Sequence, residues 1–212
     1  MKRSLFSTLV LIIIMGFISS TSFAVPVNYT GYGPYRTTTL NGQGGVVAGY
    51  YNIDIGNDGN VFKSFCLDII DSPPSGVADY DLVDLSAVPE GNSGGPMGSN
   101  AANALKRLWG KYYSPNLSAY DAASFQIATW EIVYDWNNID LLSGTANFSG
   151  GNTYGAQSML NNLGSNTANI YGLTNPDYQD FVATPEPTTM LLFGTGLLGL
   201  VGFGRKKFFK KG

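Results

Sequence analysis

The side chains that could do chemistry in this 212-residue sequence form a restricted set. Histidine is absent, and Cys66 is the single cysteine. A Ser-His-Asp triad or a Cys-His pair therefore cannot be built, and neither can a metal site based on histidine or on a thiolate cluster. Carboxylates, tyrosines, lysines and one thiol remain. We therefore expect no cofactor and no metal site.

Two short motifs place polar groups among apolar neighbours. Residues 64–68 (SFCLD) lie in a predicted strand, and residues 123–132 (ASFQIATWEI) lie in a predicted helix. A buried amide without partners costs ~1–3 kcal/mol, so Gln126 needs a hydrogen-bonding partner. One interpretation is structural: Gln126 bonds to a backbone carbonyl group, and Cys66 packs as a small hydrophobic residue.

The same motifs support a second interpretation. An aromatic-Cys-aliphatic-Asp strand followed by aromatic-Gln-x-Ala-x-Trp resembles the thioester domains of bacterial surface adhesins. The resemblance spans about residues 45–135. It implies that Cys66 and Gln126 form an internal thioester, which would react with an amine or hydroxyl group on a surface partner. The residues expected to support the bond, as aromatic cover or as a base, are Phe65, Asp68, Phe125 and Trp130.

An alternative function class is a carbohydrate-active enzyme that uses two carboxylates. The candidates near the motifs are Asp68, Asp71, Glu131 and Asp135. Such an enzyme needs its carboxylates at a set separation, which a sequence does not give. Nothing in the sequence marks a substrate pocket, so we expect no enzyme beyond a single-turnover attachment. A non-covalent structural protein of an extracellular matrix is the other alternative.

The first half of the chain has the composition of β-structure. Residues 35–40, 45–55 and 61–70 are rich in β-branched and aromatic residues, which favours strands. The turn-forming residues 56–60 (GNDGN) predict a hairpin between the last two of these strands. Residues 79–86 predict a further strand. Period-two alternation along 61–70 places Cys66 on the more polar face of its strand.

The second half is predicted to be helical, over about residues 100–112, 119–136 and 154–163. Ser118, with Asp121 three residues on, is typical of a helix start. The middle helix is apolar nearly all round, which indicates that it is buried. The predicted fold class is therefore α+β: a β-rich part (about 25–90), sandwich- or barrel-like, with a small helical subdomain (about 100–164).

The N-terminal residues 1–24 have the three parts of a secretory signal peptide. Met1-Lys2-Arg3 is a positive region, residues 5–18 are apolar, and residues 22–24 (SFA) form a small-residue cleavage site. This order is typical of a segment that is removed on export.

Three blocks follow one another in the C-terminal residues 184–212. Pro185-Glu186-Pro187 is a stiff break, and residues 188–204 are an uncharged run that would span roughly 25 Å as a helix. A basic end follows, which places this end on the cytoplasmic side. Its cations are Arg205, Lys206, Lys207, Lys210 and Lys211. We expect a transmembrane helix over 188–204.

This C-terminal order resembles the PEP-CTERM sorting signal of Gram-negative, biofilm-forming bacteria. The resemblance implies recognition by a membrane-embedded exosortase, a transient anchor in the inner membrane and cleavage near Pro185-Glu186-Pro187. It also implies delivery of the ectodomain (25–183) to the cell surface or to its exopolysaccharide.

The charge of the chain is unevenly distributed. Between Val25 and Thr184 there are 5 basic and 14 acidic residues, a net charge of −9. Such a surface argues against binding to nucleic acid, whose phosphates would be repelled.

Overall fold

The structure is a computed structural model that describes residues 24–90, 95–150 and 152–184. The predicted signal peptide, apart from Ala24, lies outside the described residues. So do Pro185-Glu186-Pro187, the predicted helix 188–204 and the basic end. No helix within the described ranges has the length and apolar character needed to cross a membrane.

The described chain contains strands, three α-helices and two short 3₁₀ turns. The strands are β1 (Ala24–Leu40), β2 (Gln43–Ile55), β3 (Val61–Ser64), β4 (Val77–Asp84), β5 (Phe148–Ser149), β6 (Tyr171–Asn175) and β7 (Tyr178–Ala183). The helices are α2 (Gly98–Tyr112), α3 (Ala119–Asp135) and α4 (Thr153–Asn161), and the 3₁₀ turns are η1 (Leu85–Ala87) and η3 (Trp136–Asn138). The three predicted helices and the predicted hairpin are thus present, and α2 begins two residues earlier than predicted.

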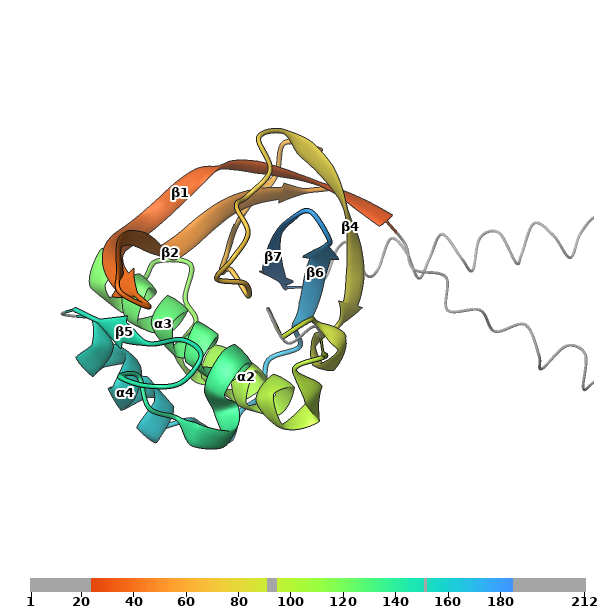
Figure 1. The fold of residues 1–212 in the computed structure, drawn as a ribbon. Coiled ribbons are helices and arrows are strands. Elements are labelled where there is room, and N and C mark those ends of the chain that lie inside the picture. The colour runs from red at the N-terminus through yellow and green to blue at the C-terminus, as the bar shows by residue number, and fades with distance from the viewer. Residues whose placement is uncertain (1–23, 91–94, 151, 185–212) are drawn as a thin grey trace, which may run out of the picture.

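The strands form one antiparallel sheet in the order β3-β2-β1-β4-β6-β7, with β5 paired to the end of β1. The sheet is strongly curled. In Figure 1, β1 and β2 arch over the β6–β7 hairpin, β4 descends on one side, and the helices lie below. The predicted α+β class is confirmed. The sheet is open, in place of the predicted sandwich or barrel.

The segment after β3 brings the two ends of this sheet together. The strand predicted over 61–70 ends at Ser64, because the chain then leaves β2 and pairs with β7. The Val182 N–H donates to the Phe65 carbonyl oxygen at 3.0 Å, and the Leu67 N–H donates to the Asp180 carbonyl oxygen at 2.8 Å. Phe65, Cys66 and Leu67 are all buried, so the prediction of alternating faces to Ile70 is wrong here.

Helix α3 is the central helix of the fold. Its start is fixed by Ser118, whose hydroxyl accepts from the Asp121 N–H at 3.1 Å and donates to the Asp121 carboxylate at 2.7 Å. Every residue from Ala122 to Tyr134 is buried, as the apolar composition predicts. The helix packs against β1 and β2 and against α2 and α4, so sheet and helices share one hydrophobic core.

Candidate functional site

The Gln126 amide and the Cys66 backbone are hydrogen-bonded to each other in the core. The Gln126 Nε2 donates to the Cys66 carbonyl oxygen at 2.7 Å, and the Cys66 N–H donates to Gln126 Oε1 at 3.0 Å. Both residues are fully buried. The Gln126 side chain, which comes from α3, therefore makes the two hydrogen bonds that a neighbouring strand would make. It holds the 65–67 segment against the helix.

The Cys66 thiol lies in a polar turn that follows this segment. The sulfur donates to the Asp68 carbonyl oxygen at 2.6 Å and accepts from the Asp68 N–H at 3.2 Å. Burial raises the pKa of the Cys66 thiol well above its ordinary value, and the negative charge of Asp68 adds to this rise. The hydrogen bond from the Asp68 N–H acts in the opposite direction. The thiol is therefore protonated at neutral pH in this arrangement.

The aromatic residues expected to cover the pair are buried in the core. Phe65 lies 4.5 Å from Phe125 between ring centroids, and Trp109 of α2 meets both rings edge-on. Trp130 stacks on Phe148 with an interplanar angle of 7°. None of these rings is more than 4% exposed, so water is excluded from this part of the core.

Asp68 contacts the thiol with its backbone only. Its carboxylate Oδ1 accepts from the Ile70 and Asp71 N–H groups at 2.5 and 3.2 Å, and thereby closes the turn that leaves the core. Burial raises the pKa of Asp68, and the neighbouring charge of Asp71 adds to this. Asp68 and Asp71, two of the four carboxylates weighed for an enzyme, thus lie together in one turn.

The other two carboxylates, Glu131 and Asp135, hold the loop that follows α3. Glu131 Oε1 accepts from the Asp140 N–H at 2.6 Å. The Asp135 carboxylate accepts from the Thr145 and Ala146 N–H groups at 2.9 and 2.8 Å. These bonds fix the loop to the helix end. Burial, together with the charges of Asp135 and Asp140, raises the pKa of Glu131 to about 7.

The sequence analysis missed the contribution of β7. Gln179 Nε2 donates to the Asp68 carbonyl oxygen at 3.3 Å, and the Tyr80 hydroxyl donates to the Gln179 carbonyl oxygen at 3.0 Å. Asp180 is also buried, and burial with the nearby charges of Asp68 and Asp71 raises its pKa to about 7. The aromatic and β-branched residues of 178–183 are the signal that could have predicted this strand.

The acidic turn between β2 and β3 has a structural purpose. Asp54, at the start of this turn, accepts from the Asp58 and Gly59 N–H groups at 3.1 and 2.9 Å. Throughout the described ranges, histidine, cysteine and acidic side chains form no group of three or more that could hold a metal ion.

Comparison with known proteins identifies one part of the chain. No curated protein and no solved structure matches it. A family model for the PEP-CTERM protein-sorting motif matches residues 183–206, which include Pro185-Glu186-Pro187, the apolar run 188–204 and the first two cations, Arg205 and Lys206. The motif marks the chain as an exosortase substrate, an exported protein that is anchored transiently in the membrane before cleavage.

Proposed function

We propose that this exported protein is a cell-surface or biofilm-matrix adhesin that attaches covalently through an internal thioester between Cys66 and Gln126. The observation that carries the proposal is the pair of hydrogen bonds between the Gln126 amide and the Cys66 backbone. They hold the carboxamide beside the residue that bears the chain's single thiol. The partner would present an amine or a hydroxyl group.

The chemistry requires contact more than it requires a strong base. The Cys66 sulfur forms a bond to the Gln126 side-chain carbonyl carbon, the bond from that carbon to nitrogen breaks, and the thiol proton leaves with the nitrogen as ammonia. An amide is a poor electrophile, so the two groups must be held together by rigid elements. Helix α3 and the 65–67 segment, both buried and hydrogen-bonded on two sides, supply that rigidity.

The product would be protected and would act once. The rings of Phe65, Phe125, Trp109 and Trp130 exclude water from the core around the pair. A partner amine would attack the thioester carbonyl carbon, release the Cys66 thiol and leave an amide bond between Gln126 and the partner. Each molecule would react once, so this function is attachment and not turnover catalysis.

Intact-mass analysis of the mature protein, secreted from a host that contains the sorting enzyme, tests the proposal. The mass should be lower than that of the processed sequence by one ammonia, and methylamine should add its own mass and free the thiol. Cys66→Ala and Gln126→Glu should each abolish the loss of ammonia. Gln157→Ala, which changes an exposed amide on α4, should retain it.

Alkylation separates the thioester from the structural interpretation of the same hydrogen bonds. Cys66 is fully buried, so an unreactive thiol in the folded protein would not be informative. The protein should therefore be alkylated in denaturant at mildly acidic pH, before and after methylamine. A mass equal to that of the processed sequence, with no loss of ammonia, together with complete alkylation of Cys66 before methylamine would show that Gln126 has a structural role only.

A further inference from the structure

A row of tyrosines lies on one face of β1 and β2. Tyr29, Tyr32 and Tyr35 come from β1 and Tyr51 from β2, and we call these four residues the tyrosine face. The Tyr32 ring centroid lies 5.2 Å from that of Tyr51, 5.4 Å from that of Tyr35 and 5.6 Å from that of Tyr29. Tyr32 and Tyr35 are 41% and 45% exposed, whereas Tyr51 is buried. The row therefore runs from the interior to the surface.

Two irregularities in β1 bring these side chains to the same side. In a regular strand, Tyr29 and Tyr35 would face one way and Tyr32 the other. The pairing with β2 shifts register between Tyr29 and Gly31, and again between Tyr32 and Tyr35. The β2 partners of the three tyrosines are Ile53, Tyr51 and Gly49 respectively. These partners are every second residue of a strand, so they lie on the same face of the sheet. All three tyrosines therefore share the face of Tyr51.

Glycine makes the second irregularity possible. Gly49 has φ +152°, and a Cβ there would lie 2.6 Å from the Pro34 carbonyl oxygen and from Tyr35. Only a residue without a side chain lets β1 approach β2 this closely. Bulges of this kind commonly re-aim side chains next to functional sites. The local backbone is thus built to present Tyr32 and Tyr35 outward.

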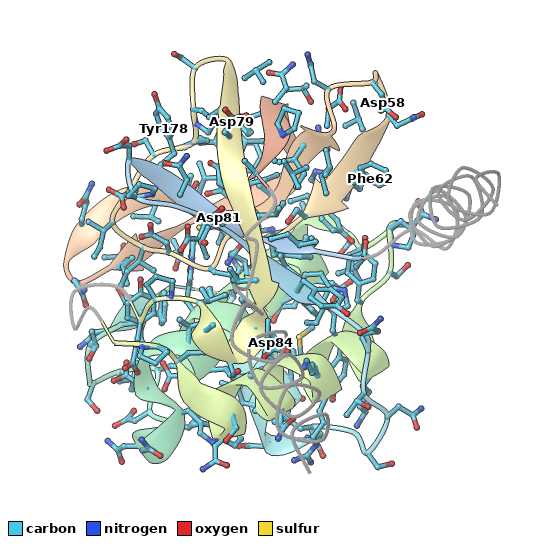
Figure 2. The ribbon with its side chains drawn as sticks, turned by 90° about the vertical axis from the view of Figure 1, so that its right-hand side faces the viewer. Asp58, Phe62, Asp79, Asp81, Asp84 and Tyr178 are labelled. Atoms are coloured by element: carbon cyan, nitrogen blue, oxygen red, sulfur yellow. The ribbon has the colours of Figure 1, made fainter. Side chains whose placement is uncertain are left out.

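The charge around the tyrosine face limits what can bind there. All four members of the face are tyrosines, so the face itself holds no acidic or basic residue. The neighbouring strand β4 bears Asp79, Asp81 and Asp84, which Figure 2 labels along its length. Asp79 and Asp81 pair with Pro26 and Ala24 of β1, so they lie on the opposite side of the sheet and add to the acidity of the molecule as a whole. The nearest cation in sequence, Arg36, lies over the Tyr120 ring of α3 at 5.5 Å. With a net charge of −9 between Val25 and Thr184, the surroundings would repel an anionic chain.

We propose that the tyrosine face binds an uncharged polysaccharide chain. Tyrosine offers a rigid apolar ring with a polar hydroxyl group, at a low cost in conformational entropy. A neutral sugar chain has the matching surface, because its rings present C–H groups on their faces and hydroxyl groups on their rims. A stable interface between two proteins buries about 800 Å² of surface on each partner. A row of tyrosines one residue wide is therefore better suited to a single extended chain than to a second protein. This binding goes beyond the proposed thioester, since it requires neither Cys66 nor Gln126.

Affinity electrophoresis of the mature secreted protein tests the inference. Native gels would contain hydroxyethyl cellulose, dextran or galactomannan as neutral chains, and alginate as an anionic chain. At least one neutral gel should retard the wild-type protein, and alginate should not. Tyr32→Ala combined with Tyr35→Ala should weaken that binding by about tenfold or more, as for the loss of central aromatic anchors. Tyr154→Ala, which removes an 82% exposed tyrosine on α4, should have no effect.

Several outcomes would overturn the inference. They are equal retardation of the wild-type protein and the double variant, no retardation in any neutral gel, and equal retardation by alginate. Self-association that the double variant abolishes, seen by sedimentation in place of polysaccharide binding, would assign the face to a protein contact instead. Cys66→Ala should be retarded like the wild-type protein, so failure of the thioester proposal would leave this result unchanged. Circular dichroism should confirm that the double variant is folded.

Discussion

Gln126 and Glu131 lie five positions apart on α3, and both are fully buried, yet their environments differ. Both functional groups of the Gln126 amide are hydrogen-bonded to the Cys66 backbone. Glu131 uses Oε1 to accept from the Asp140 N–H, whereas its Oε2 has no hydrogen-bonding partner within the described part of the chain. The Gln126 amide is neutral, and its oxygen and nitrogen both have hydrogen-bonding partners. The Glu131 carboxyl group is ionisable, and only one of its two oxygens has such a partner.

The difference shows what each group can contribute. A satisfied buried amide fixes geometry, because breaking it leaves two backbone groups without partners. A half-satisfied carboxyl group responds to protons, because burial opposes its charged form. The Cys66 end of α3 is therefore expected to be rigid and insensitive to Glu131. The loop end, where Glu131 meets Asp140, is expected to depend on pH.

The largest effect is expected when the amide is removed. On a Cys66→Ala background, where no thioester can form, Gln126→Ala should lower the free energy of unfolding by roughly 2–6 kcal/mol. The reason is that the N–H and carbonyl groups of residue 66 lose their partners, at ~1–3 kcal/mol each. Urea unfolding followed by tryptophan fluorescence measures the change.

A matched amide provides the control for that measurement. Gln157 donates to Asn161 Oδ1 at 3.0 Å on exposed helix surface. Gln157→Ala should therefore change the free energy of unfolding by no more than about 0.5 kcal/mol. If both alanine variants had the same stability, the hydrogen bonds of Gln126 would not hold the 65–67 segment to α3.

The second effect concerns Glu131 and pH. Its pKa is raised from 4.5 to about 7 in the folded protein, so the protonated form is favoured there. The stability that this group contributes is complete below pH 4.5, falls as the pH rises to about 7, and is absent above that. Glu131→Gln should remove roughly 3 kcal/mol of this pH dependence. Urea unfolding of both proteins between pH 4.5 and 8 would reveal it.

Asp180 offers a contrast for the same experiment. Its pKa is also raised to about 7, but by burial and by the charges of Asp68 and Asp71, not by the groups around Glu131. The effect of Glu131→Gln on the pH profile should therefore be the same whether or not the protein also carries Asp180→Asn. If the free energy of unfolding depended on pH in the same way in the wild-type and Glu131→Gln proteins, Glu131 would not be the source of this pH dependence.

The smallest effect is expected at the exposed start of α3. Ser118 caps the helix, so Ser118→Ala should lower the free energy of unfolding by about 1 kcal/mol. It should not change the pH profile or the contact at Gln126, since the rest of the helix is held by packing. Ser158→Ala, on the exposed surface of α4, is the control and should have almost no effect. If Ser118→Ala and Ser158→Ala had equal free energies of unfolding, Ser118 would not stabilise α3 as a cap.

Local patterns were sufficient to predict several of these features. The capping residue Ser118, the buried character of α3 and the β2–β3 hairpin all depend on neighbours in sequence, and the structure confirms them. Phe65, Phe125 and Trp130 are buried, as are Cys66 and Gln126, and their role as cover for the pair stays a prediction. The thioester itself stays a prediction, because a hydrogen-bonded pair is also what a structural glutamine would form.

Long-range pairing accounts for what the sequence did not predict. The strand at 61–70 was expected to continue, because period two says nothing of a change of partner from β2 to β7 at Ser64. β7 forms a local hairpin with β6, but its second pairing is with the 65–67 segment, more than a hundred residues earlier, and a local pattern does not show that contact. The shared side of Tyr29, Tyr32 and Tyr35 depends on bulges that appear only when β1 meets Gly49.

The position of β7 at the end of the described chain sets the order of events during export. A secreted chain crosses the membrane from its N-terminal end, so residues 178–183 emerge long after Cys66 and Gln126. Until then the 65–67 segment has α3 on one side and no strand on the other, since its second partners are Asp180 and Val182. We therefore expect the contact at Cys66 to be completed only when the chain has passed almost to Pro185, at the time when the sorting motif arrives.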